Sequence, residues 1–161
     1  MKRNLLLNAV FIGALIGTFW WLWPSAKPMP EVTFNLLDGR TLQSQELRGR
    51  PLLINFWSVS CEVCLRDMPH LALLEKEFSD RELMVIGVAV PHDPPPAVIG
   101  AVEKMAPGYA IALDVHGEVS KAFGDVRVTP TNFLIDPDGN VRHSQRGPLD
   151  RIRLRATIAT F

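Results

Sequence analysis

The two cysteines of the chain, Cys61 and Cys64, are separated by two residues and lie where an expected strand gives way to an expected helix. The apolar run 52–57 predicts a short buried strand, and apolar residues recur at helical spacing from Cys64 to Phe78. A cysteine at the start of a helix lies near unpaired backbone N–H groups, which favour its thiolate. That thiolate can attack a disulfide, and a second thiol one turn later can resolve the mixed disulfide. The spacing therefore predicts thiol–disulfide exchange.

A zinc site and a purely structural disulfide are the alternatives for this pair. Structural zinc needs about four ligands, whereas the chain has only two cysteines, and the nearest histidine, His70, lies six residues beyond Cys64. The four histidines show no ligand spacing relative to one another, so no metal and no other cofactor are expected. A bridge across so short a loop constrains the unfolded chain only weakly. Redox chemistry is the preferred interpretation.

The N-terminal segment from Leu5 to Trp23 carries no charged residue. At about 1.5 Å per residue, such a helix nearly crosses a bilayer core of about 30 Å. Two basic residues before it predict a single-pass protein of the cytoplasmic membrane whose remaining part faces the periplasm or the cell exterior. A cleaved signal peptide is the alternative, although the segment exceeds the usual apolar length of about 7–15 residues. We expect residues 1–23 to be the anchor, 24–30 a proline-rich linker and 31–161 the catalytic domain.

The charge of the chain argues against one class of partner. Seventeen basic and seventeen acidic residues give a net charge of zero. No basic patch interleaved with aromatic residues is visible in the sequence, so nucleic acid is not an expected partner.

The segment after the linker alternates expected strands with expected helices. The expected strands are 31–37, 40–42, 52–58, 83–90, 110–113, 131–135 and 141–145, and the expected helices are 44–47, 61–78, 97–105, 117–123 and 150–160. Residues 136–140 form an expected hairpin turn, and Ile152, Leu154 and Ile158 are the expected apolar face of the last helix. This order predicts an α/β fold with a mixed central sheet flanked by helices on both faces.

Three separated motifs resemble those of the TlpA-like thioredoxins, a family of membrane-anchored thiol-disulfide oxidoreductases that includes the ResA and CcmG types. The motifs are Asn55-Phe56-Trp57, the stretch from Cys61 to Pro69, and the stretch from Thr129 to Asp136, in this order. The resemblance runs from about Glu31 to the C-terminus. It implies a thioredoxin-like fold in which residues 92–113 supply the family's additional helix and strand.

The resemblance also implies roles for particular residues. Cys61 becomes the exposed nucleophile and Cys64 the buried resolving thiol, which form the redox disulfide. Pro130 becomes a cis-proline that faces the dithiol, although the residues alone would predict an ordinary trans turn. The expected substrate contacts are Trp57, Glu62, Thr129 and Pro130.

The chain departs from the family pattern at some positions. Ser60 and Val63 stand where the family usually has tryptophan and proline, and Asn55 stands where thioredoxins proper have an aspartate.

Asp67 occupies the position, three residues after the second cysteine, at which the ResA type has an acidic residue that handles protons. Residues three apart lie on nearly the same face of a helix, so a partly buried carboxylate there can accept the proton of Cys64. The alternative is a solvated surface charge paired with His70 or with a distant arginine.

The function implied is the reduction of protein disulfides outside the cytoplasm, with apocytochrome c or one of its assembly factors as substrate and a transmembrane electron donor of the DsbD or CcdA type. The negative charge of Glu62 beside Cys61 disfavours the thiolate and favours the reducing direction, whereas the dipole of the helix acts in the opposite sense. A copper-binding chaperone is an alternative, but such proteins have a wider cysteine spacing and a specifically placed histidine. A peroxidase would have threonine at Ser58 and proline at Ile54. A disulfide oxidase or isomerase shares the same residues.

Overall fold

The structure of the protein is a computed structural model that describes residues 27–161. The expected membrane anchor, residues 1–23, lies outside the described residues. Within residues 27–161, no helix has both the length and the apolar character needed to cross a membrane.

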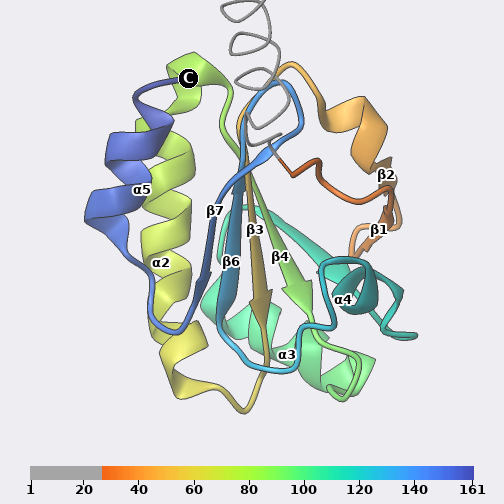
Figure 1. The fold of residues 1–161 in the computed structure, drawn as a ribbon. Helices are drawn as coiled ribbons and strands as arrows, with labels where there is room; N and C mark the ends of the chain where they lie inside the picture. Colours follow the sequence, from red (N-terminus) through yellow and green to blue (C-terminus); the bar gives the residue numbers. More distant parts are fainter. Residues whose placement is uncertain (1–26) are drawn as a thin grey trace, which may run out of the picture.

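A single seven-stranded mixed sheet forms the centre of the described chain (Figure 1). The strands are β1 (Thr33–Leu36), β2 (Thr41–Gln43), β3 (Leu52–Trp57), β4 (Met84–Ala89), β5 (Ala110–Leu113), β6 (Thr131–Ile135) and β7 (Val141–Arg146). Their order across the sheet is β2-β1-β5-β4-β3-β6-β7. Strands β3, β4 and β5 are parallel to one another, and the remaining pairs are antiparallel. The predicted mixed sheet is confirmed.

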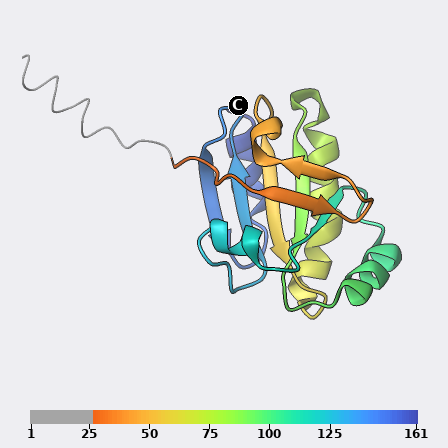
Figure 2. The same cartoon turned by 90° about the vertical axis from the view of Figure 1, so that its right-hand side faces the viewer.

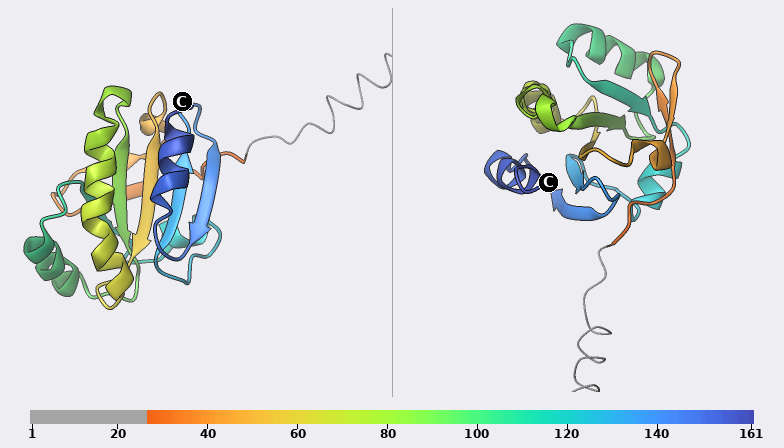
Figure 3. Two further views of the ribbon diagram at one scale, coloured as in Figure 1. Left: turned by 90° about the vertical axis from the view of Figure 1, so that its left-hand side faces the viewer. Right: turned by 90° about the horizontal axis from the view of Figure 1, so that it is seen from above.

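Helices cover both faces of this sheet, as Figure 3 shows. The α-helices are α2 (Glu62–Glu77), α3 (Pro95–Met105), α4 (Glu118–Ala122) and α5 (Arg151–Ile158), and the short 3-10 helices are η1 (Ser44–Leu47) and η2 (Ser79–Arg81). One core joins α2, α3 and α5 to the sheet, and a second core joins η1 and α4 to the opposite face. Figure 2 looks onto the face that carries η1 and α4.

Strand β3 lies in the middle of the sheet because both of its faces are apolar. All six of its residues are buried. Leu53 and Trp57 contribute to the core beneath α2, whereas Leu52, Ile54 and Phe56 contribute to the core beneath α4. A continuous apolar run is what a strand covered on both faces requires.

Helix α5 packs through fewer residues than its sequence predicts. Leu154 and Ile158 are fully buried, but Ile152 is 84% exposed. Residues four apart share a helix face, whereas a residue two positions away points about 200° around the axis. The inclusion of Ile152 in the apolar face is therefore wrong. Asp150 begins the helix as predicted, because its carboxylate accepts the N–H of Arg153 at 3.0 Å.

The end of the proline-rich segment is paired with the domain. The N–H of Met29 donates to the carbonyl of Gly139 at 2.8 Å, and the N–H of Val141 donates to the carbonyl of Lys27 at 2.8 Å. Met29 is buried in the core beneath α4. The last residues of the segment expected to be a linker are thus held against the turn between β6 and β7.

Candidate active site

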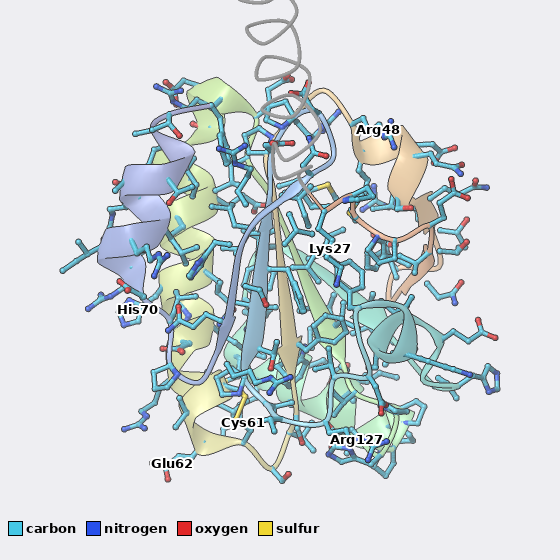
Figure 4. All side chains as sticks on the ribbon, in the orientation of Figure 1. Lys27, Arg48, Cys61, Glu62, His70 and Arg127 are labelled. Carbon is cyan, nitrogen blue, oxygen red and sulfur yellow. A yellow bond between two sulfur atoms is a disulfide. The ribbon has the colours of Figure 1, made fainter. Side chains whose placement is uncertain are left out.

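The two cysteines form a disulfide at the start of α2, beyond the ends of β3 and β4 (Figure 4). Their sulfurs are 2.07 Å apart and their Cα atoms 5.2 Å apart. Cys61 precedes the first helical residue, and its Sγ accepts the N–H of Cys64 at 3.2 Å. Cys61 is partly exposed, whereas Cys64 is fully buried. This asymmetry lets an external disulfide reach Cys61 and reserves Cys64 for attack within the protein.

The Thr129–Pro130 peptide bond is cis, which confirms the expectation from the resemblance. Thr131 pairs with Phe56 across β6 and β3, so Pro130 lies beside the end of β3, from which the chain continues to Cys61. Pro130 is buried and Thr129 is partly exposed. The carbonyl of Pro130 accepts the N–H of Gly147 at 2.8 Å. Pro130, one of the expected substrate contacts, thus lies at the dithiol end of the sheet.

Trp57 lies near the dithiol but not at the surface. Its side chain is 0% exposed and belongs to the same apolar core as Cys64. Its indole N–H has no hydrogen-bond partner among the described residues. The expected substrate contact at Trp57 is therefore not supported, and the side chain instead packs beneath the site. Glu62 is exposed in the first turn of α2, at the same end of the molecule as Cys61 (Figure 4).

Asp67 is partly buried and holds a distant part of the chain. Its Oδ2 accepts the N–H of Leu149, in the segment before α5, at 3.0 Å. The alternative pairing with His70 is not what the structure has, because Nδ1 of His70 lies 3.2 Å from Nη1 of Arg151. Asp67 is therefore not a freely solvated charge, and it sits one helical turn from the buried thiol of Cys64.

Tyr109 adds a buried hydroxyl that faces α2. Burial raises the pKa of Tyr109, and the carboxylates of Glu75 and Asp67 raise it further. Glu75 accepts the N–H of Val85 at 2.8 Å, and burial raises the pKa of Glu75 above its usual value. The Tyr109 hydroxyl thus stays protonated and has no hydrogen-bond partner among the described residues. The sequence alone gave no indication of this cluster.

An asparagine pair occupies the buried position that holds an aspartate in thioredoxins proper. Asn55 and Asn132 lie opposite each other on β3 and β6, and both are almost fully buried. Nδ2 of Asn55 donates to Oδ1 of Asn132 at 2.8 Å. Two neutral amides stand here in place of an ionisable group, so this position cannot accept the proton of Cys64. Asp67 is the candidate carboxylate for that role.

Asp93 is the polar residue near the dithiol that the sequence-based expectations missed. It lies between β4 and α3, in the segment that separates the expected strand 83–90 from the expected helix 97–105, and its buried carboxylate accepts hydrogen bonds from Ser58 and Val59. A signal was present, because adjacent parallel strands place their C-terminal ends together, and Asp93 follows the buried strand next to the one that leads to Cys61. Within residues 27–161, no three His, Cys, Asp or Glu side chains gather in an arrangement that could hold a metal ion.

Comparison with known proteins agrees with this geometry. The model of the Redoxin family matches residues 24–158. The chain is 28% identical over 159 residues to the thiol-disulfide oxidoreductase ResA of Bacillus cereus, covering 91% of each protein. It is 29% identical over 112 residues to ResA of Bacillus subtilis, covering 70% of this chain and 62% of that protein.

The fold is also that of solved structures. A thiol:disulfide interchange protein of the thioredoxin family from Chlorobium tepidum superposes with a TM-score of 0.75, covering 85% of this chain and 97% of that one at 24% identity. The thioredoxin-like fold expected from the motifs is confirmed. The chain belongs to the Redoxin family and is a thiol-disulfide oxidoreductase of the ResA type.

Proposed function

We propose that the protein is a membrane-anchored reductase of protein disulfides that acts outside the cytoplasm. The observation that carries this proposal is the unequal exposure of the pair, with Cys61 partly exposed at the start of α2 and Cys64 fully buried. A substrate disulfide can reach only one of the two sulfurs. The sulfur of Cys64 is closed to the substrate and lies one helical turn from the carboxylate of Asp67.

The reaction runs in two exchanges. The thiolate of Cys61 attacks one sulfur of the substrate disulfide, whose bond breaks, and the second substrate sulfur leaves and takes a proton. Cys64 then gives its proton to Asp67 and attacks Sγ of Cys61, so the mixed disulfide breaks and the Cys61–Cys64 bond forms. The first substrate sulfur leaves and takes a proton. Two electrons and two protons pass from the dithiol to the substrate. A donor dithiol must return them before the next turnover.

The negative charge of Glu62, next to the partly exposed Cys61, supports the reducing direction. Glu62 is exposed in the first turn of α2, next to Cys61. Its negative charge disfavours a second negative charge on the neighbouring sulfur, so it lowers the stability of the reduced, thiolate-bearing form relative to the disulfide. The N–H of Cys64, at 3.2 Å from Sγ of Cys61, acts in the opposite sense.

The attachment of the linker supports an outward-facing dithiol. Lys27 pairs with the β6–β7 turn, and Ile135 at the end of β6 pairs with Leu52 at the start of β3. Cys61 follows the other end of β3, which is on the order of 20 Å away at about 3.3 Å per residue. If the apolar N-terminal segment spans the membrane, the dithiol points away from the bilayer. We propose a transmembrane donor of the DsbD or CcdA type, and apocytochrome c or an assembly factor as substrate.

Trapping of the mixed disulfide tests this function. In Cys64→Ser, the resolving thiol is absent, so Cys61 should accumulate in covalent complexes that dithiothreitol dissolves and mass spectrometry identifies. Cys61→Ser is the matched control and should give none. A folded Cys64→Ser protein that traps no partner, or equal trapping by both variants, would overturn the proposal. A membrane-impermeant maleimide should label reduced Cys61 in intact cells, and labelling only after lysis would contradict the proposed location.

A further inference from the structure

A buried carboxylate outside the dithiol contacts the segment that leads into Cys61. The side chain of Asp93 is 4% exposed. Its Oδ1 accepts the hydroxyl proton of Ser58 at 2.9 Å, and its Oδ2 accepts the N–H of Val59 at 2.8 Å. Asp93 is separated from these residues by more than thirty positions in sequence, so these contacts join two different parts of the fold.

The hydroxyl groups next to Cys61 are oriented by this carboxylate. An ionised carboxylate only accepts hydrogen bonds, so the proton of Ser58 is used on Asp93. Ser60 Oγ lies 2.9 Å from Ser58 Oγ and must therefore donate to it. The N–H of Ser60 also donates to Ser58 Oγ at 3.2 Å, and the N–H of Cys61 donates to the carbonyl of Ser58 at 3.1 Å. The turn before Cys61 is thus closed, with its donors directed toward Ser58 and Asp93.

The parallel pairing of β3 and β4 brings Asp93 to this turn. Trp57 pairs with Ala89 at the ends of the two strands, and the N–H of Val90 donates to the carbonyl of Trp57 at 3.1 Å. The N–H of Asp93 then donates to the carbonyl of Val90 at 3.1 Å, which turns the chain back toward β3. The contact therefore follows from the sheet register.

We propose that Asp93 is a positioning residue that acts through Ser58 and Ser60 to hold Cys61 in its thiol form and the dithiol on its reducing side. Two physical effects have this sign. A buried negative charge is screened only weakly and disfavours a thiolate nearby. The Ser60 hydroxyl donates its proton to Ser58, so it does not donate a hydrogen bond to the sulfur of Cys61 that would stabilise the thiolate. This inference rests on Cys61 being the attacking thiol of the proposed function, and it adds a determinant of the direction of the reaction.

Other charges at this end of the molecule set the background for the titration of Cys61. Glu62 on α2 is exposed beside Cys61, and the exposed His92 lies with Nε2 3.8 Å from Oδ1 of Asp93. Arg127, between α4 and β6, lies at the same end of the molecule (Figure 4) and forms an ion pair with Asp125. Both effects of Asp93 are tested against this fixed background by changing Asp93 alone.

The test is the pH dependence of iodoacetamide alkylation of Cys61 in the full-length chain, in detergent and in the Cys64→Ser background. Only the thiolate reacts. Asp93→Asn should move the midpoint of the profile to lower pH by about half a unit or more, which is about three-fold faster alkylation below the midpoint. Asp93→Glu, which keeps the charge, should restore most of the wild-type profile. An unmoved midpoint in folded Asp93→Asn would overturn the proposal.

Two further variants keep the test decisive. Asp136→Asn is a matched control, because Asp136 is also a buried carboxylate that accepts a backbone N–H at 2.8 Å, but at the opposite end of the sheet, and its midpoint should not move. Ser58→Ala breaks the hydroxyl chain and keeps the charge, so it should shift the midpoint in the same direction by less. If Asp93→Asn does not fold, an unmoved midpoint in Ser58→Ala overturns the proposal.

The outcome is separable from that of the trapping experiment. Alkylation needs no substrate, so an unmoved midpoint would leave the proposed reductase function standing. Conversely, if Cys64→Ser with Asp93 intact traps no partner but Asp93→Asn still shifts the alkylation profile, the proposed function fails and the role of Asp93 remains. A concordant second readout is the equilibrium of the Cys61–Cys64 pair with glutathione. At pH values above the alkylation midpoint, where Cys61 is a thiolate, Asp93→Asn should raise the ratio of reduced to oxidised protein by up to about three-fold.

Discussion

Replacing Asp67 with asparagine separates the two interpretations of this carboxylate, as a proton acceptor and as a structural contact. Asparagine retains a side-chain oxygen, so it can still accept the N–H of Leu149 that Asp67 accepts at 3.0 Å. What it loses is the charge. The hydrogen bond to a charged acceptor is worth about 1 kcal/mol more than one to a neutral acceptor, so we expect the free energy of unfolding to fall by about 1 kcal/mol or less.

The expected effect on the reaction is larger and confined to one step. A positioned general base contributes about 10²–10⁴-fold to a proton transfer, so the attack by Cys64 should slow by at least about ten-fold at neutral pH. The initial attack by Cys61 should be unchanged. The slowing should fade as the pH rises past about 8.5, where an ordinary thiol ionises unaided.

Stopped-flow mixing of the reduced protein with dithiobis(nitrobenzoate) measures both steps. The first thionitrobenzoate leaves when Cys61 attacks, and the second leaves when Cys64 attacks, so two absorbance phases report two rates. Glu77→Gln is the matched control, because Glu77 is a carboxylate of the same helix that binds Arg155 of α5 at 2.7 Å. An unchanged second phase in Asp67→Asn, or equal slowing of both phases with a stability loss above about 2 kcal/mol, would refute the proton-acceptor role.

Three further predictions concern stability, and urea unfolding measures each of them. Gly87→Ala should lower the free energy of unfolding by about 1–3 kcal/mol, because the added Cβ would lie 2.8 Å from Cδ1 of Ile111. An unchanged free energy of unfolding would contradict this prediction. Burial raises the pKa of Glu75, so the Glu75 carboxyl holds its proton more tightly in the folded protein than in the unfolded chain. The stability that comes from this difference is lost as the pH rises. The wild type should therefore lose stability relative to Glu75→Gln as the pH rises above the usual glutamate pKa of about 4.3, and a pH-independent difference would contradict this. Leu154→Ala should cost about 2–4 kcal/mol, whereas Ile152→Ala, at an 84% exposed position, should change stability by less than about 0.5 kcal/mol.

Much of the fold could be predicted because local pattern and tertiary environment agree. The strand of Ala110–Leu113 and the strand of Thr131–Ile135 have the predicted bounds, and the expected hairpin joins the second of these to β7. Ile152 shows where the prediction failed. An apolar residue was assigned to the core by its type, although its angular position on the helix, two residues from Leu154, directs it to solvent.

The candidate site was predictable where a motif carries it and not where only tertiary packing does. The Cys61–Cys64 bridge and the cis bond at Pro130 lie within recognisable motifs. The burial of Trp57 could not be predicted from its motif, because exposure depends on the helix that covers the end of β3. Asp93 contacts the segment before Cys61 because of the register of two strands, and no spacing within one segment encodes that contact.

The pairing of residues 27–30 with the β6–β7 turn has the same origin. Proline-rich composition predicts an extended segment, which is what the backbone adopts, but it does not predict a partner. The partner is supplied by backbone groups of Gly139 and Val141. The contact needs only an extended segment and these backbone groups, and the sequence of neither segment predicts the other as its partner.

The direction of electron flow is the central claim, and the reduction potential of the Cys61–Cys64 pair tests it most directly. Equilibration of the full-length protein with defined ratios of reduced and oxidised glutathione, followed by acid quenching and thiol counting, gives this potential. We predict a value close to or below that of thioredoxin, about −270 mV, so that the dithiol donates electrons to substrate disulfides. A value near that of the oxidant DsbA, about −120 mV, would contradict the account and make the protein a disulfide oxidase.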